Sequence, residues 1–242
     1  MPHYLTYEAI LATFRAGNLV RVGPDDKLTP LAKEFLDRHP ELLAKSSKHK
    51  QQPEEAHLPV KSRTPLIAGN WKMHKTVSQS VTLVNELKQF CSDTTGREIL
   101  VCPPTPSLAL VNEILRGSPI KLGAQNLHWE TEGAFTGEIS GAMLKDAGCV
   151  YVIVGHSERR QYFGETDEWV NKKMKAAFRH GLVPIVCVGE TLQEREKNEQ
   201  FKVVERQVRN GASGLSAEES AKLVVAYEPV WAIGATKAME PR

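Results

Sequence analysis

Six short apolar runs alternate with helical patterns from Thr64 onward, and this alternation constrains the fold more than any other sequence feature. The runs recur roughly every thirty residues, and each is followed by a helical pattern or, after the sixth, by an apolar loop. They are Pro65–Gly69, Glu98–Val101, Lys121–Gln125, Cys149–Val154, Val183–Val188 and Leu223–Tyr227. This rhythm predicts parallel strands joined by right-handed crossovers.

Two architectures share this rhythm, an open doubly wound sheet and a (β/α)₈ barrel. A dinucleotide-binding sheet would carry G-x-G-x-x-G after its first strand, where this chain has Gly69-Asn-Trp-Lys72. A barrel places its chemistry at the C-terminal ends of several strands, and polar residues follow these strands here. The predicted fold class is therefore α/β, a (β/α)₈ barrel of which six βα units are present. Its first and sixth strands would keep unpaired edges.

Local signals bound the predicted helices. Helical patterns cover about Val77–Phe90 and about Asp167–His180, and another begins at Thr105-Pro106 and ends at Gly117. Two further helices begin with capping boxes, in which a Ser or Thr precedes a Glu by three residues: Thr191 with Glu194, and Ser216 with Glu219.

Residues 1–63 differ from the rest, and we interpret them as a helical extension and linker preceding a domain at 64–242. One helix is predicted from Tyr7 through Phe14, and a second begins with Thr29 as N-cap and Pro30 at its first position and ends near His39-Pro40. No strand pair is predicted here. The stretch Lys45–Arg63 is rich in Lys, Ser, Gln and Pro, which is typical of a linker.

Composition excludes several classes of protein. The net charge of +2 gives no reason to expect nucleic acid or a membrane surface as partner. The four cysteines are widely spaced, and the histidines form no H-x-H or H-x-x-x-H pair, so we expect reduced thiols and no metal. No apolar run has transmembrane length and no signal peptide is recognisable, so a cytoplasmic location is expected.

The segment Val225–Gly234 reads Val-Ala-Tyr-Glu-Pro-Val-Trp-Ala-Ile-Gly. Glu228 follows the sixth strand, which we expect to be covered on both faces because its apolar run is unbroken. The apolar loop after Pro229 predicts a lid over Glu228, with Gly234 absorbing the backbone rotation. A carboxylate under such a lid loses water, which raises its pKa and makes it a stronger base. An ordinary surface glutamate remains the alternative.

Other polar side chains follow the first and fourth strands. Asn70 and Lys72 would face the same way in an extended chain, and Lys72 suits an anionic substrate. His156 emerges from the fourth strand, and Ser157 after it can cap a helical turn. An imidazole at a helix N-terminus lies in positive partial charge, which disfavours its protonated form.

We expect Glu158 to pair with Lys72 and hold it in place. Because His156 shares a strand-end rim with Glu228, Asn70 and Lys72, we interpret it as functional rather than as a core histidine. Cys187 and Glu190, at the end of the fifth strand, are interpreted as structural.

Five segments together resemble the triosephosphate isomerase family, in order and at that family's spacing. They are Ala68-Gly-Asn-Trp-Lys-Met73, Gly123-Ala-Gln-Asn126, Gly155-His-Ser-Glu-Arg-Arg160, Cys187-Val-Gly-Glu190 and Ala226-Tyr-Glu-Pro-Val-Trp-Ala-Ile-Gly234. The resemblance covers about Thr64–Lys237 and implies a TIM (β/α)₈ barrel. It also implies isomerisation of dihydroxyacetone phosphate and D-glyceraldehyde 3-phosphate through an enediol(ate), a step of glycolysis and gluconeogenesis.

The resemblance further implies a role for each polar residue, and the base and neutral-imidazole roles are those known for this family. Glu228 would move a proton between two carbons, and neutral His156 would polarise and protonate the oxygens. Lys72 would stabilise negative charge and Asn70 would donate a hydrogen bond. A backbone N–H near Gly234 would reach the phosphate. No cofactor or metal is implied, because proton transfer beside a carbonyl needs an acid, a base and a positive field.

The family also inserts a long loop into a second subunit, and His128–Glu138 resembles that loop. Thr136 at its tip would pack near Met73 and Lys72 of a partner subunit, which implies a homodimer. The apolar side chains of Trp129 and Phe135 fit such burial.

The chain departs from the family pattern near its end. Ala235-Thr-Lys237 stands where the family usually has Thr-Gly-Lys, and 238–242 do not continue the pattern. We therefore expect the seventh and eighth strands, which carry phosphate-binding N–H groups in the family, to be missing, and residues 1–242 alone to be a poor enzyme. The alternative function is a catalytically impaired remnant that serves as a scaffold, with the N-terminal helices binding a partner.

Overall fold

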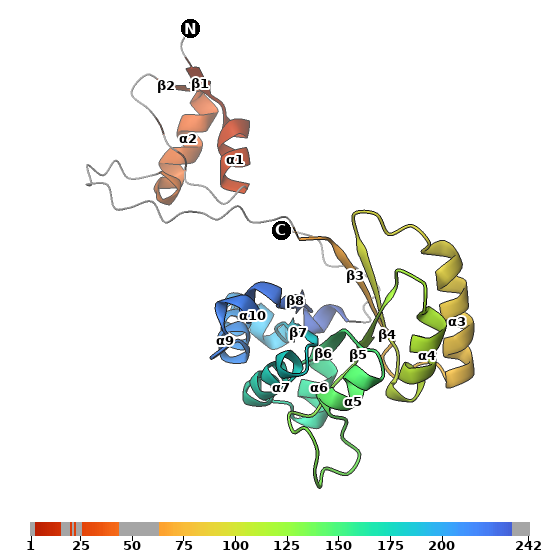
Figure 1. Ribbon diagram of the computed structural model, residues 1–242. Coiled ribbons are helices and arrows are strands. Elements are labelled where there is room, and N and C mark those ends of the chain that lie inside the picture. Colours follow the sequence, from red (N-terminus) through yellow and green to blue (C-terminus); the bar gives the residue numbers. More distant parts are fainter. Residues whose placement is uncertain (1–2, 16–19, 21, 23–25, 44–62, 234–242) are drawn as a thin grey trace. The chain divides into compact units, whose positions relative to one another are not determined.

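The computed structural model describes residues 3–15, 20, 22, 26–43 and 63–233 (Figure 1). The chain divides into two compact units, Met1–Lys61 and Ser62–Arg242, and each is described by itself. Most of the predicted linker, and Gly234 of the predicted lid, lie outside the described residues.

The first unit contains both predicted helices, α1 (Tyr7–Arg15) and α2 (Pro30–Arg38), and a 3₁₀ helix at Pro40–Leu42. Thr29 is the N-cap of α2, although its side chain makes no capping hydrogen bond. The prediction that no strand pair exists here was wrong, because β1 (His3–Leu5) pairs in parallel with β2 (Asp26–Leu28). Strands of three residues are too short for an apolar alternation to reveal them. The buried core is small: Ile10, Val20, Ala32, Leu36 and Leu42.

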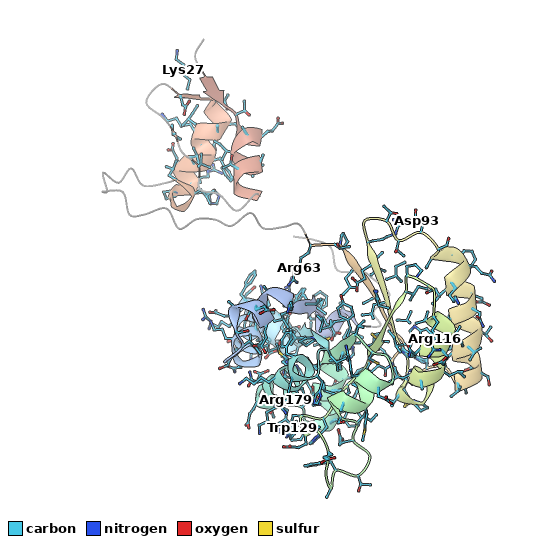
Figure 2. The ribbon with its side chains drawn as sticks, in the orientation of Figure 1. Lys27, Arg63, Asp93, Arg116, Trp129 and Arg179 are labelled. Carbon is cyan, nitrogen blue, oxygen red and sulfur yellow. The ribbon has the colours of Figure 1, made fainter. Side chains whose placement is uncertain are left out.

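The second unit is built on the six predicted strands, all parallel and in sequence order across the sheet. The strands are β3 (Leu66–Asn70), β4 (Glu98–Cys102), β5 (Lys121–Ala124), β6 (Tyr151–Val154), β7 (Val183–Val188) and β8 (Val224–Tyr227). Their bounds differ from prediction by two residues at most. The sheet curves, and Arg63 (Figure 2) donates hydrogen bonds to the carbonyl oxygens of Ala221 and Leu223 just before β8.

Helices cover the outer face of this sheet. They are α3 (Val77–Phe90), α4 (Leu108–Leu115, after a 3₁₀ turn at Thr105–Ser107), α5 (Gly141–Asp146), α6 (Ser157–Phe163), α7 (Asp167–Arg179), α8 (Leu192–Glu196), α9 (Gln200–Gly211) and α10 (Ala217–Lys222). The capping boxes predicted at Thr191 and Ser216 are both present. A 3₁₀ turn at Val230–Ala232 follows β8.

Apolar side chains pack on both faces of the curved sheet. On the outer face, strand residues such as Val152 and Val186 pack against helix residues such as Val170 and Met174. On the inner face, a second cluster contains Leu100, Cys102, Ile153, Ile185 and Cys187. A sheet buried in this way holds the strand ends, and the polar residues that follow them, in fixed positions.

The two edge strands are less well covered. β3 and β8 each pair with one neighbour in the described structure, as predicted for six units. The expectation that β8 is covered on both faces was wrong, because Val225 is 48% exposed and Tyr227 is 43% exposed. The side chains of these two residues lie on the outer face of the sheet. On that face the central strands β5, β6 and β7 are covered by α4, α7 and α9. Ile67 of β3 is likewise 57% exposed.

Candidate active site

The predicted site residues lie at the C-terminal ends of three strands. Asn70 is the last residue of β3, His156 follows β6 by two residues, and Glu228 directly follows β8. Together with Lys72 they line one cavity of about 300 Å³, which is closed on one side by Pro229, Ala232 and Ile233. The sheet therefore brings together four side chains that lie up to 158 positions apart in the sequence, from 70 to 228.

A direct contact joins Glu228 to His156. The Nε2 atom of His156 lies 3.1 Å from Oε1 of Glu228. The backbone N–H of Glu158 donates to Nδ1 of the same ring at 3.2 Å. Because Nδ1 accepts, we assign the ring proton to Nε2, where a neutral imidazole donates it to the carboxylate.

The environment of Glu228 corrects one prediction, that its pKa is raised. Burial does raise it, but hydrogen bonds from His156, from the Cys187 thiol and from the backbone N–H of Ser157 outweigh burial. The net pKa lies below the ordinary value of 4.5. Donors to a carboxylate stabilise its charged form, and the apolar run that precedes Glu228 could not reveal them.

The start of α6 also differs from prediction. Its N-cap is His156, not Ser157, because the His156 ring accepts the N–H of Glu158. Ser157 instead donates its backbone N–H to Oε2 of Glu228 at 3.3 Å. His156 is thus held by the helix that it caps, with its Nε2 atom directed at Glu228 in the cavity.

Lys72 is held by three different groups. Its Nζ lies 2.8 Å from Oε1 of Glu158, which confirms the predicted ion pair. Its backbone does not continue β3 in the predicted extended form, because φ is 50°. The Asn70 side chain accepts the backbone N–H of Lys72, and Gln125 donates to its carbonyl oxygen at 2.8 Å. A lysine in the left-handed region is uncommon, and these bonds stabilise it there.

Glu190 has the structural role that we assigned to it, and its contacts extend to the predicted lid. Its carboxylate is fully buried and accepts hydrogen bonds from Tyr227 Oη at 2.9 Å and from Trp231 Nε1 at 2.9 Å. The backbone N–H of Val230 donates to its carbonyl oxygen. The base of the predicted lid is therefore tied to the end of β7. Tyr227 and Trp231 flank Glu228 in the sequence, and their polar side-chain atoms were the signal that could have indicated this tie to Glu190.

A buried ionic network supports the His156 turn from behind. Glu165 accepts the backbone N–H of Gly155 at 2.8 Å, Arg159 Nε at 2.8 Å and Lys173 Nζ at 2.5 Å. Lys173 also donates to Asn126 Oδ1 after β5. Both partners of the Glu165–Lys173 pair are at most 4% exposed. The sequence analysis did not identify this network, because its members lie on α6, on α7 and on the segments that follow β5, β6 and α6.

The predicted intersubunit loop leaves the sheet after β5 and extends away from it (Figure 1). His128 stacks on Trp129 with ring centroids 4.3 Å apart and lies at the same distance from Phe135. Trp129, labelled in Figure 2, also contacts Trp169 of α7. Thr136 is exposed, and Met73 is 94% exposed. A second cavity of about 690 Å³ extends from the Lys72 side chain toward this loop.

Two features are absent from the part of the chain that the structure describes. Among those residues, no group of three or more His, Cys, Asp or Glu side chains is arranged to hold a metal ion. Within the same ranges, no helix has the length and apolar character needed to span a membrane.

Comparison with known proteins agrees with this geometry. Residues 65–242 match the family profile described as triosephosphate isomerase. Over 179 residues the chain is 60% identical to the triosephosphate isomerase of Endomicrobium trichonymphae, which covers 74% of this chain and 72% of that protein. It is 58% identical over 179 residues to the enzyme of the same name from Carboxydothermus hydrogenoformans, covering 74% and 71%.

Among solved structures, the chain is similar to a triosephosphate isomerase from Bartonella henselae. The TM-score is 0.65 at 44% sequence identity, over 70% of this chain and 69% of that one. These matches favour an isomerase over the alternative scaffold function, and the chain belongs to the triosephosphate isomerase family.

Proposed function

We propose that the second unit interconverts dihydroxyacetone phosphate and D-glyceraldehyde 3-phosphate by proton transfer through an enediol(ate), using Glu228 as the base. The observation that carries this proposal is the 3.1 Å contact between Glu228 and the neutral His156 ring, in a cavity that Lys72 also lines. A base, a neutral donor and a cation are the groups that proton transfer beside a carbonyl requires.

The geometry supports a separate role for each group. Glu228 is ionised at neutral pH and can accept the proton once substrate replaces His156 as its neighbour. His156 then donates Nε2–H to a substrate oxygen. Lys72 and Asn70 bind the substrate, and Lys72 stabilises the negative charge that develops on the enediolate. Glu158 holds Lys72 through the ion pair, and Ser157 donates its backbone N–H to Glu228. A backbone N–H near Gly234, outside the described residues, binds the phosphate.

A turnover assay in deuterium oxide tests this function. Either triose phosphate should be converted to the other, with deuterium entering at the carbon that exchanges its proton with Glu228. Product formation is followed by proton NMR spectroscopy, and the Glu228→Gln variant is assayed in parallel for comparison. Absence of conversion, or equal conversion by the variant, would contradict the proposal.

We also propose that the chain forms a homodimer through the loop His128–Glu138, with Thr136 packing near Met73 of the partner. The support is the exposure of Met73 beside a cavity that reaches the loop, and the apolar Phe135, which is 43% exposed at the surface. An exposed methionine and phenylalanine next to a cavity favour burial against a second chain.

Replacing Phe135-Thr136 by Gly-Ser should therefore shift the protein from dimer to monomer, as measured by light scattering at several concentrations. The matched control is Phe90→Ser on α3, which removes a phenylalanine that is 83% exposed but far from the loop in sequence. A parent chain that is monomeric at every concentration would contradict the proposal, as would an equal effect of both changes.

Two further proposals concern the setting of the enzyme. A cytoplasmic location is supported by the four free cysteines, which persist in reducing compartments. Residues 1–63 are proposed to be an extension and linker separate from the isomerase domain at 64–242, since the family match begins at residue 65.

A further inference from the structure

The main chain after β7 and the main chain of Glu228 lie unusually close together at Gly189. A Cβ atom at Gly189 would lie 1.8 Å from the carbonyl oxygen of Glu228 and 2.6 Å from its carbonyl carbon. No side chain fits there without moving the Glu228 backbone. The backbone N–H of Glu228 also donates to Val188 at 2.7 Å. The position of Glu228 therefore depends on the position of the Val188–Gly189 segment.

One side chain from a distant helix holds this segment. Gln207 of α9 is 5% exposed, and its amide makes two hydrogen bonds with the same residue. Its Oε1 accepts the N–H of Gly189 at 2.8 Å, and its Nε2 donates to the carbonyl oxygen of Gly189 at 3.2 Å. The side-chain amide of glutamine carries an acceptor and a donor next to each other. Gln207 can therefore bond both the N–H and the carbonyl oxygen of Gly189, which lies just after β7.

We propose that Gln207 is a positioning residue for the isomerase reaction, fixing Glu228 through Gly189. It does not touch the reacting atoms. The inference rests on the proposed role of Glu228 as base. A proton transfer is sensitive to the placement of the base, and a misplacement of about 1 Å can cost on the order of 10²-fold in rate.

Gln207→Met tests this in the full chain, because methionine keeps the length of the side chain and removes both hydrogen bonds. We expect kcat to fall by about 10- to 100-fold with KM changed less than about threefold, since the substrate's phosphate is bound elsewhere. The matched control is Gln193→Met on α8, where the glutamine is exposed. A folded Gln207→Met chain with kcat within about twofold of the parent overturns the inference.

Gln207→Glu provides a second measurement, the pH dependence of activity, which a merely structural role of Gln207 would not change. An ionised carboxylate can accept from Gly189 but cannot donate to its carbonyl oxygen, whereas a protonated carboxyl can do both. The activity of this variant relative to the parent should therefore rise as pH falls. Gln207 and Gly189 line a cavity of about 610 Å³ whose charged groups are Arg160, Arg206, Glu194 and Glu228. These groups are present in both chains, so the activity ratio isolates the change at residue 207. If the activity of Gln207→Glu relative to the parent is constant with pH, the inference is overturned. This test applies even if Gln207→Met fails to fold.

Amide hydrogen exchange gives an answer that does not depend on turnover. The amides of Gly189 and Glu228 should exchange faster in Gln207→Met than in the parent, while those within α9 do not. Unchanged exchange at Glu228 overturns the inference. Failure of the proposed function can be distinguished from failure of this inference. If Glu228 is not the base, Glu228→Gln would be as active as the parent, whatever the activity of the Gln207 variants.

Discussion

Replacing Glu228 by glutamine is expected to lower kcat by at least about 10²- to 10⁴-fold, the usual contribution of a general base. Glutamine has nearly the same shape, and its one amide oxygen can keep one of the two hydrogen bonds that the carboxylate accepts from His156 and from the Ser157 N–H. It cannot take a proton from carbon. The loss should fall on kcat more than on KM, because the carboxylate acts in the transition state rather than in binding the phosphate.

Steady-state kinetics in both directions would measure this effect, with thermal unfolding to show that the fold is intact. The matched control is Glu196→Gln, the same chemical change at an exposed position of α8, which should leave kcat unaltered. A loss smaller than about threefold in Glu228→Gln would reject Glu228 as the base, since general acid–base catalysis contributes far more than that.

The second large effect is expected on stability, from Glu165→Gln. Burial already lowers the pKa of Lys173, which is 2% exposed, and loss of the carboxylate partner removes the interaction that opposes this shift, so the charged form of Lys173 becomes costly in the interior. Removing one partner of a buried pair typically lowers the free energy of unfolding by about 3–5 kcal/mol, because the other charge stays desolvated. The Gly155 N–H donates to Oε1 and Arg159 donates to Oε2, so the single amide oxygen of glutamine can replace only one of these two acceptors.

The pH dependence of this effect has a definite sign. Burial raises the pKa of Glu165, but Lys173, Arg159 and the Gly155 N–H outweigh it, so the folded pKa lies below the ordinary 4.5. The stabilisation is therefore complete above the unfolded pKa near 4.5 and is lost as pH falls through the lower folded value. The stability difference between parent and Glu165→Gln should shrink in that acid range.

Urea unfolding at neutral pH and at a series of acidic pH values would measure both quantities. Glu218→Gln is the matched control, because it breaks an ion pair with Lys222 that is exposed on both sides. We expect no measurable change from it. A Glu165→Gln chain as stable as the parent at neutral pH, or a stability difference that is the same at every pH, would show that the network does not stabilise the fold as an ionic unit.

The sequence alone was sufficient for features that depend on neighbours along the chain. The six parallel strands follow from apolar runs and their spacing, and the helix starts at Thr191 and Ser216 follow from capping boxes that close within one turn. The rim of Asn70, Lys72, His156 and Glu228 could be predicted because the C-terminal ends of parallel strands meet at one end of a barrel.

The tertiary structure decided the features that depend on contacts between distant segments. The lowered pKa of Glu228 comes from donors on β7 and α6, and the tie between Glu190 and Trp231 joins residues 41 positions apart. Gln207 meets Gly189 only because α9 packs on β7. Exposure of β8 likewise depends on which elements cover it, not on its own apolar run. Periodicity and caps report local backbone preference, whereas these contacts depend on where the packed core places each element.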